Sequence, residues 1–288
     1  MSRSKLLPYL LLLPSIIVVC AVIIYPICYG VYLSITDQSL IGREAHIVGL
    51  RNFVNLYKDE VFRRVIVNAA LWSIYTVVGV MVLGLGLALL LNRDFVGRTF
   101  ARGILLVPWT VPTTALAIIF AWLYDPMMGT VNQIVMALGG PRLSLLSDTS
   151  TALAWVALPV IWRFCPFVML MLLAELQSID KDLYDAAGVD GAGSLQKFWS
   201  ITLPIMRPTI SLVAILQFIW IFNHVDMIWV LTRGGPANAT HILSTYAFYY
   251  SYKRWEYGYA SAVGVLMLAV LFVSAAMYLR REGRSEAK

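Results

Sequence analysis

Residues 182–204 read Asp-Leu-Tyr-Asp-Ala-Ala-Gly-Val-Asp-Gly-Ala-Gly-Ser-Leu-Gln-Lys-Phe-Trp-Ser-Ile-Thr-Leu-Pro, the longest polar interval between apolar runs in the C-terminal half. The pattern predicts two short helices joined by a turn. Asp182 is expected to cap the first helix and Ser194 the second, because their oxygens can accept from the free amides of an opening turn. Gly191 permits a tight turn between them, and the second helix must end or bend before Pro204. This knuckle, as we call residues 182–204, should allow close docking of another protein.

The sequence on either side of the knuckle is that of a membrane protein. Of the 288 residues, 60% are apolar and 13% are charged, whereas ordinary soluble domains carry roughly 25% charged residues. Several apolar runs approach the ~20 residues that cross a bilayer, which predicts an all-α integral membrane protein of about six spans. The expected spans are roughly 6–33, 65–91, 104–124, 151–175, 207–231 and 258–279.

Prolines and glycines modify the expected spans. Pro108 and Pro112 predict a kinked or broken third span, and Pro159 and Pro166 predict an interrupted fourth span. In the second span, glycines 79, 84 and 86 could allow a neighbouring helix to approach closely. Between the first two spans, residues 52–64 are amphipathic and predict an interfacial helix.

The knuckle contains a recognisable spacing. An acidic residue and two alanines (Asp185, Ala186, Ala187) are followed after three residues by Gly191, and after nine more by Ile201-x-Leu203-Pro204. This resembles the EAA motif, Glu-Ala-Ala-x3-Gly-x9-Ile-x-Leu-Pro, of membrane subunits of bacterial ABC importers. Asp185 stands where that family usually has Glu, so the charge is kept with one methylene less reach. Other segments resemble the carbohydrate-importing branch of the family, among them Gly-Leu-Arg-Asn-Phe at 49–53, Val-Pro-Trp at 107–109 and Leu-Thr-Arg-Gly-Gly-Pro at 231–236.

The resemblance implies a type I ABC importer permease fold, with residues 1–288 as one transmembrane domain. In that family the knuckle is a cytoplasmic coupling helix that fits a cleft in an ATP-hydrolysing subunit. The implied partners are a second permease in a heterodimer, two ATP-binding subunits that use ATP and Mg, and an extracytoplasmic sugar-binding protein. This chain would then bind no cofactor and hydrolyse no ATP, and it would lie in the bacterial inner membrane with both termini cytoplasmic. The implied coupling residues are Asp185, Ala186, Ala187, Asp190, Gly191, Ile201, Leu203 and Pro204.

The fifth expected span carries a second group of candidates. Polar side chains inside a membrane are costly and usually face other helices or a wet cavity. At 100° per residue, Gln217 and His224 share one face of a helix, while Asn223 and Asp226 lie together on another. Asn223 and Asp226 could bond to sugar hydroxyls, and Trp220 or Trp229 could stack on a sugar ring. Alternatively, these polar groups bond only between helices.

Arg163 lies in the middle of the fourth expected span, where a charge is expensive unless it is paired. Asp226 is the acidic residue that falls within an expected span core. We therefore expect the two to form a structural ion pair.

Other functions are less well supported by the sequence. The net charge of +6 is scattered between the spans and not gathered into a nucleic-acid stripe. The three cysteines lack metal-ligand spacing, and the aspartates of the knuckle do not match a calcium-binding loop. A stand-alone secondary transporter or channel should show internal repeats or a selectivity ring. An intramembrane enzyme should show a catalytic motif such as H-E-x-x-H.

Overall fold

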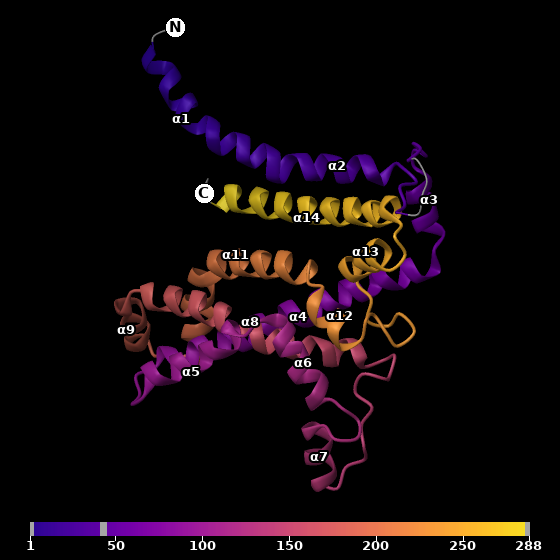
Figure 1. Ribbon diagram of the computed structural model, residues 1–288. Helices are drawn as coiled ribbons and strands as arrows, with labels where there is room; N and C mark the ends of the chain where they lie inside the picture. Colours follow the sequence, from indigo (N-terminus) through magenta and orange to yellow (C-terminus); the bar gives the residue numbers. More distant parts are fainter. Residues whose placement is uncertain (1–2, 41–44, 286–288) are drawn as a thin grey trace. The chain divides into compact units, whose positions relative to one another are not determined.

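The computed structural model describes residues 3–40 and 45–285, and its regular elements are helices. Within these ranges, β-type pairing is confined to two isolated bridges, Thr36 with Ile47 and Ser39 with Glu256. The chain divides into two compact units, Met1–Phe62 with Tyr246–Val270, and Arg63–Thr245 with Leu271–Lys288. Figure 1 labels the helices along the chain.

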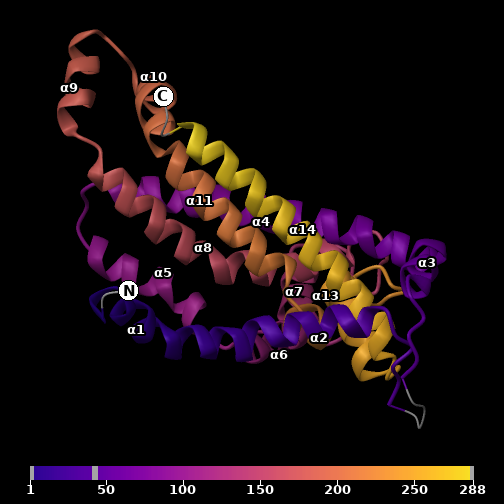
Figure 2. The same ribbon diagram turned by 90° about the horizontal axis from the view of Figure 1, so that it is seen from above.

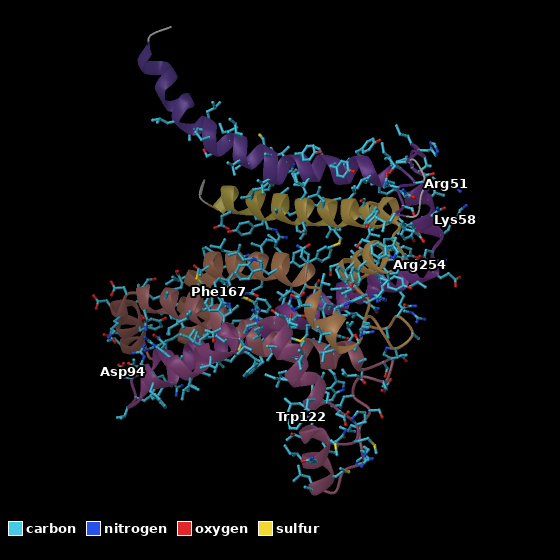
Figure 3. The ribbon with its side chains drawn as sticks, viewed as in Figure 1. Arg51, Lys58, Asp94, Trp122, Phe167 and Arg254 are labelled. Atoms are coloured by element: carbon cyan, nitrogen blue, oxygen red, sulfur yellow. The ribbon has the colours of Figure 1, made fainter. Side chains whose placement is uncertain are left out.

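The first unit contains the N-terminal helical run and the start of the last long helix. Its elements are α1 (Arg3–Val19), the π-helical turn η1 (Cys20–Ile24), α2 (Tyr25–Ser34), α3 (Arg51–Lys58), most of α13 (Leu243–Tyr252) and the first part of α14 (Tyr257–Ser285). The buried Asn52 amide donates to the carbonyls of Ser34 (2.9 Å) and Thr36 (2.8 Å), which ties α3 to the end of α2. Figure 3 labels Arg51 and Lys58 on α3. The amphipathic segment predicted at 52–64 is therefore two helices, because α3 ends at Lys58 and α4 begins at Glu60.

Asp59 lies at the junction between α3 and α4 and fixes this unit. Its carboxylate accepts hydrogen bonds from the hydroxyls of Tyr246 (2.5 Å) and Tyr259 (2.8 Å), and from the amide of Val61 (2.9 Å). Burial on its own would raise the pKa of Asp59, but these hydrogen bonds and one from the Phe62 amide bring that pKa below its usual value. The charged carboxylate thus holds two widely separated parts of the sequence together.

The second unit is built around α8 (Ala152–Ser178). It also contains α4 (Glu60–Asn92) from Arg63 onward, α5 (Arg98–Thr110), α6 (Thr113–Leu123), α7 (Thr130–Ala137), α9 (Lys181–Val189), α10 (Ser194–Lys197), the π-helical turn η2 (Phe198–Thr202), α11 (Leu203–Phe222) and α12 (Asp226–Leu231). Helices α5 and α11 pack along α8, and α12 packs on α6 and α8 (Figures 1 and 2). Val160, Val168 and Leu172 of α8 are fully buried. Such burial on most sides suits a helix whose residues are mostly apolar.

Two glycines let α4 approach α8 closely. A Cβ on Gly79 would lie 2.6 Å from the Ile161 side chain, and one on Gly84 would lie 2.6 Å from Val168. A Cβ on Gly86 would have no atom of the described residues within 4 Å. Helix contact through small residues is therefore confirmed for the first two positions only.

The membrane-spanning character is clear from helix length and composition. Within residues 3–40 and 45–285, five segments could cross a membrane, and α5 with α6 pass the same test only together, bent by 93°. The predicted all-α membrane protein with about six spans is confirmed. The five single segments are Leu11–Ser34, Glu60–Asn92, Ala152–Ser178, Ser194–Leu231 and Tyr257–Glu282.

The prolines act differently in the third and fourth spans. The predicted break of the third span is confirmed at Val111 and Pro112, between α5 and α6. The predicted interruption of the fourth span is wrong, because α8 runs without a break through Pro159 and Pro166. Both prolines are buried, and tight packing by neighbouring helices allows a helix to continue past the hydrogen bonds that proline removes.

Candidate functional site

The knuckle folds as two short helices with a turn, as predicted, but different residues cap them. Asp180 precedes α9, and its Oδ1 accepts from the Asp182 amide at 3.0 Å. The predicted cap by Asp182 is therefore wrong, and this residue lies in the first turn of α9, where its charge is favourable near the positive end of the helix dipole. The predicted cap by Ser194 is also wrong, because Gly193 occupies that position and no side chain caps α10.

The glycine of the motif, Gly191, stands just after the C-terminal end of α9. Gly191 has φ +78°, and its amide donates to the Gly188 carbonyl at 3.1 Å. The next amide, from Ala192, reaches back to the Ala187 carbonyl at 2.9 Å. Together these bonds form a Schellman motif, which needs a left-handed residue where Gly191 stands. The glycine therefore ends α9 and reverses the chain.

After the turn, the chain is helical without interruption from α10 to the fifth span. α10 leads into the π-helical turn η2, and Pro204 lies in the first turn of α11, where a missing amide costs little. The predicted bend before Pro204 thus takes the form of a π-helical turn. Ile201 and Leu203 are half-buried, and Pro204 is exposed.

Two hydrogen bonds attach α9 to the segment that follows it. The Tyr184 hydroxyl pairs with Thr202 Oγ1 at 2.9 Å, and Lys197 Nζ donates to the Tyr184 carbonyl at 2.7 Å. Because Thr202 directly precedes α11, these bonds connect α9 to the start of the fifth span.

The outer surface of the knuckle is open. Asp185, Ala186, Asp190 and Gly191 are exposed, and Ala187 is half-buried. Helix α9 lies beyond the end of α8 in both ribbon views (Figures 1 and 2).

Four large apolar side chains are also exposed on or beside this surface. The sequence pattern did not single them out, although apolar residues in a segment between the spans are a usable signal of a contact surface. They are Leu183 (47% exposed), Val189 (90%), Leu195 (73%) and Trp199 (60%).

The fifth span contains the second group of candidates and is broken there. α11 ends at Phe222 and α12 begins at Asp226, so one helical wheel cannot describe residues 217–226. Asn223 Nδ2 bonds back to the Ile219 carbonyl at 2.9 Å, which competes with the continuing helix. Asn223 and Asp226 are exposed within this unit, and His224 is half-buried at the break.

Gln217 is enclosed one and a half turns before the break. Its side chain is fully buried, and neither amide atom has a hydrogen-bond partner among the described residues. His224 Nε2 also lacks a hydrogen-bond partner among the described residues. Unpaired buried polar atoms are costly, and both side chains keep unused hydrogen-bonding capacity.

Aromatic rings surround these polar groups. His224 stacks on Trp72 with ring centroids 6.4 Å apart and meets Phe164 edge-on at 6.0 Å. Trp220 is 41% exposed and contacts Phe167 edge-on at 5.1 Å; Phe167 is labelled in Figure 3. The break in the fifth span is therefore lined by exposed polar groups beside an accessible indole.

Arg163 donates a hydrogen bond at another break in the helices. Its Nε donates to the Val111 carbonyl at 3.1 Å, a carbonyl freed where α5 ends. Across the described residues no ion pair within 4.0 Å joins Arg163 to Asp226, so their pairing stays a prediction. In the same part of the chain, no three His, Cys, Asp or Glu side chains are grouped to hold a metal ion.

Comparison with known proteins identifies the family. Residues 80–284 match the family described as binding-protein-dependent transport system inner membrane component. The chain belongs to this family. It is a permease subunit of an ABC importer.

Relatives of this permease match along nearly its whole length. The sulfoquinovosyl glycerol transport system permease protein SmoG of Agrobacterium fabrum is 36% identical, with 96% of this chain and 90% of that protein covered. The trehalose/maltose transport system permease protein MalF of Thermococcus litoralis is 35% identical, with 96% and 94% covered. A solved bacterial ABC transporter involved in import of the acidic polysaccharide alginate is 25% identical with a TM-score of 0.81, covering 96% of each chain. The type I importer permease fold that the knuckle predicted is therefore confirmed.

Proposed function

We propose that this permease carries a sugar or sugar derivative into the cell. The observation that supports the cargo most directly is that relatives aligned over more than nine-tenths of the chain are named for sulfoquinovosyl glycerol and for trehalose and maltose. The alginate importer, of the same fold, handles another carbohydrate. An extracytoplasmic binding protein would deliver the sugar.

The proposed partners follow from the division of labour in ABC importers. A second, different permease would complete the pathway, and two ATP-binding subunits would supply the energy with ATP and Mg. This chain would bind no cofactor and hydrolyse no ATP. The knuckle would then face the cytoplasm of a bacterial cell, with both termini on that side of the inner membrane.

Helix α9 is the proposed coupling helix. Its open surface of small, acidic and apolar side chains suits a cleft on an ATP-binding subunit. Closure of the two ATPases would move α9, and the bonds from Tyr184 and Lys197 would pass this movement to α11. The spans would then alternate between inward-facing and outward-facing states.

The break in the fifth span is the proposed sugar contact. Asn223 and Asp226 would bond to sugar hydroxyls, Gln217 and His224 would supply unpaired polar atoms, and Trp220 would stack on the ring. Sites for small polar ligands combine a few placed polar groups with aromatic walls in this way.

Transport in proteoliposomes tests the proposal. The complete importer should accumulate a labelled sugar only with ATP inside, and loaded binding protein should stimulate ATP hydrolysis. Vesicles that contain this chain alone should not transport. Equal, ATP-independent uptake by this chain alone would support a stand-alone secondary transporter or channel instead.

A further inference from the structure

A surface cavity of about 650 Å³ lies in the second unit, between the end of α4, the last turn of α8 and the knuckle. Ten residues line it. Leu89, Leu176 and Phe198 provide apolar walls, and Arg93 and Lys197 provide positive charge. Among the described residues that line the cavity, none is acidic.

The two cations are free to bind an anion. The Arg93 side chain is exposed and forms no hydrogen bond or ion pair with any residue in 3–40 or 45–285. Lys197 Nζ gives one hydrogen bond to the Tyr184 carbonyl, which leaves two of its three protons for a ligand. An occupant must therefore join an anionic group to an apolar part.

The position of the cavity indicates the source of such a molecule. Arg93 directly follows α4, which is one of the membrane-spanning helices and ends at Asn92. The lining therefore runs from the apolar last turn of a span, at Leu89, to Arg93 just beyond the end of that span. Basic pockets between spans at this level bind anionic lipid headgroups.

We propose that this cavity binds an anionic phospholipid from the leaflet on the knuckle side. The phosphate bonds to Arg93 and Lys197, and the start of an acyl chain packs on Leu89, Leu176 and Phe198. Because Lys197 also holds α9 through Tyr184, the bound lipid steadies the knuckle. This regulatory consequence rests on the proposed coupling role of α9, whereas lipid binding itself does not.

Lipid retention by the full chain tests the proposal without any ATPase. The purified protein is equilibrated with mixed micelles of phosphatidylglycerol and phosphatidylcholine, and bound lipids are counted by native mass spectrometry. Wild type should prefer phosphatidylglycerol, and Arg93→Gln should weaken that preference about fivefold, since one surface cation contributes about that factor. Arg207→Gln is the matched control, because Arg207 is an exposed arginine early in α11 that does not line the cavity.

Three results would overturn the proposal. Wild type could show no preference for the anionic lipid, or Arg207→Gln could lower the preference as much as Arg93→Gln. Inorganic phosphate could also displace the lipid completely at equal concentration, which would make the site one for free phosphate. Since these measurements need only this chain, they can fail while the proposed transport function stands.

Discussion

At the scale of single residues, Asp180 and Gly191 define the two ends of α9. Gly191 occupies a position with φ +78° that glycine adopts at little cost. The helix caps depend on the residue at which a helix begins, and sequence patterns locate such ends only to within about two to four residues. Asp180 and Asp182 are chemically equal candidates, and the start of α9 at Lys181 selects Asp180.

Removal of this cap should loosen α9. Asp180→Ala is expected to destabilise the helix by about 1 kcal/mol, because the Asp182 amide loses its acceptor. Hydrogen exchange of the amides of α9 should accelerate accordingly. Asp182→Ala, whose side chain caps nothing, serves as the control, and equal acceleration in both variants would contradict the assignment.

Gly234 should tolerate no side chain. It has φ +88°, and an added Cβ would lie 2.2 Å from the ring of the buried His241. Gly234→Ala should therefore destabilise the protein by about 2–4 kcal/mol through backbone strain and overpacking. Gly139→Ala has a similar φ of +82° but open space around it, and should cost about 1–2 kcal/mol. Thermal unfolding in detergent compares the two, and equal losses would rule out the predicted clash.

His241 should make stability depend on pH. Burial lowers its pKa from 6.5 to about 4, so the folded state favours the neutral ring. The unfolded chain then binds more protons between these values, and stability, complete above pH 6.5, is lost as the pH falls toward 4. A shift of this size corresponds to roughly 3 kcal/mol at most. His241→Gln should flatten the dependence of the unfolding temperature on pH between 7.5 and 5, and an unchanged slope would contradict the prediction.

At the scale of elements, helix breaks were the least predictable features. Pro112 marked the break of the third span correctly, whereas Pro159 and Pro166 lie inside an unbroken α8. The fifth span breaks at residues 223–225 without proline or glycine. Its causes include the local bond of Asn223 and a hydrogen bond from Ser244 to the His224 carbonyl. Such a bond from another helix cannot be read from the local pattern.

The broken span predicts a specific transport defect. Trp220→Ala should reduce sugar uptake by about tenfold, because a stacked aromatic contact contributes about 0.5–1.5 kcal/mol beyond buried area. Trp122→Ala is the matched control, since Trp122 is 61% exposed at the end of α6 (Figure 3). Uptake is measured in proteoliposomes that contain equal amounts of assembled importer. If both variants lose the same activity, Trp220 has no special place in the pathway.

At the scale of the whole molecule, composition was enough to predict an all-α membrane protein with about six spans. Apolar runs locate spans because the bilayer imposes a length. They do not show which helices pack together, so the central position of α8 and the 93° bend between α5 and α6 required the structure. For the candidate site too, the sequence indicated the location and the fold determined the contacts. The motif located the knuckle, but its exposed apolar residues and the bonds of Tyr184 and Lys197 depend on the fold.

The central claim is that α9 couples this permease to an ATP-binding subunit. Its most direct test is co-purification in mild detergent with a co-expressed sugar-importer ATPase, comparing Gly191→Pro with Gly97→Pro. Both glycines have positive φ, +78° and +87°, which proline cannot adopt, but Gly97 precedes α5 outside the knuckle. Wild type and Gly97→Pro should retain the ATPase, while folded Gly191→Pro releases it. Full retention by Gly191→Pro, or equal loss from both variants, would contradict the coupling role.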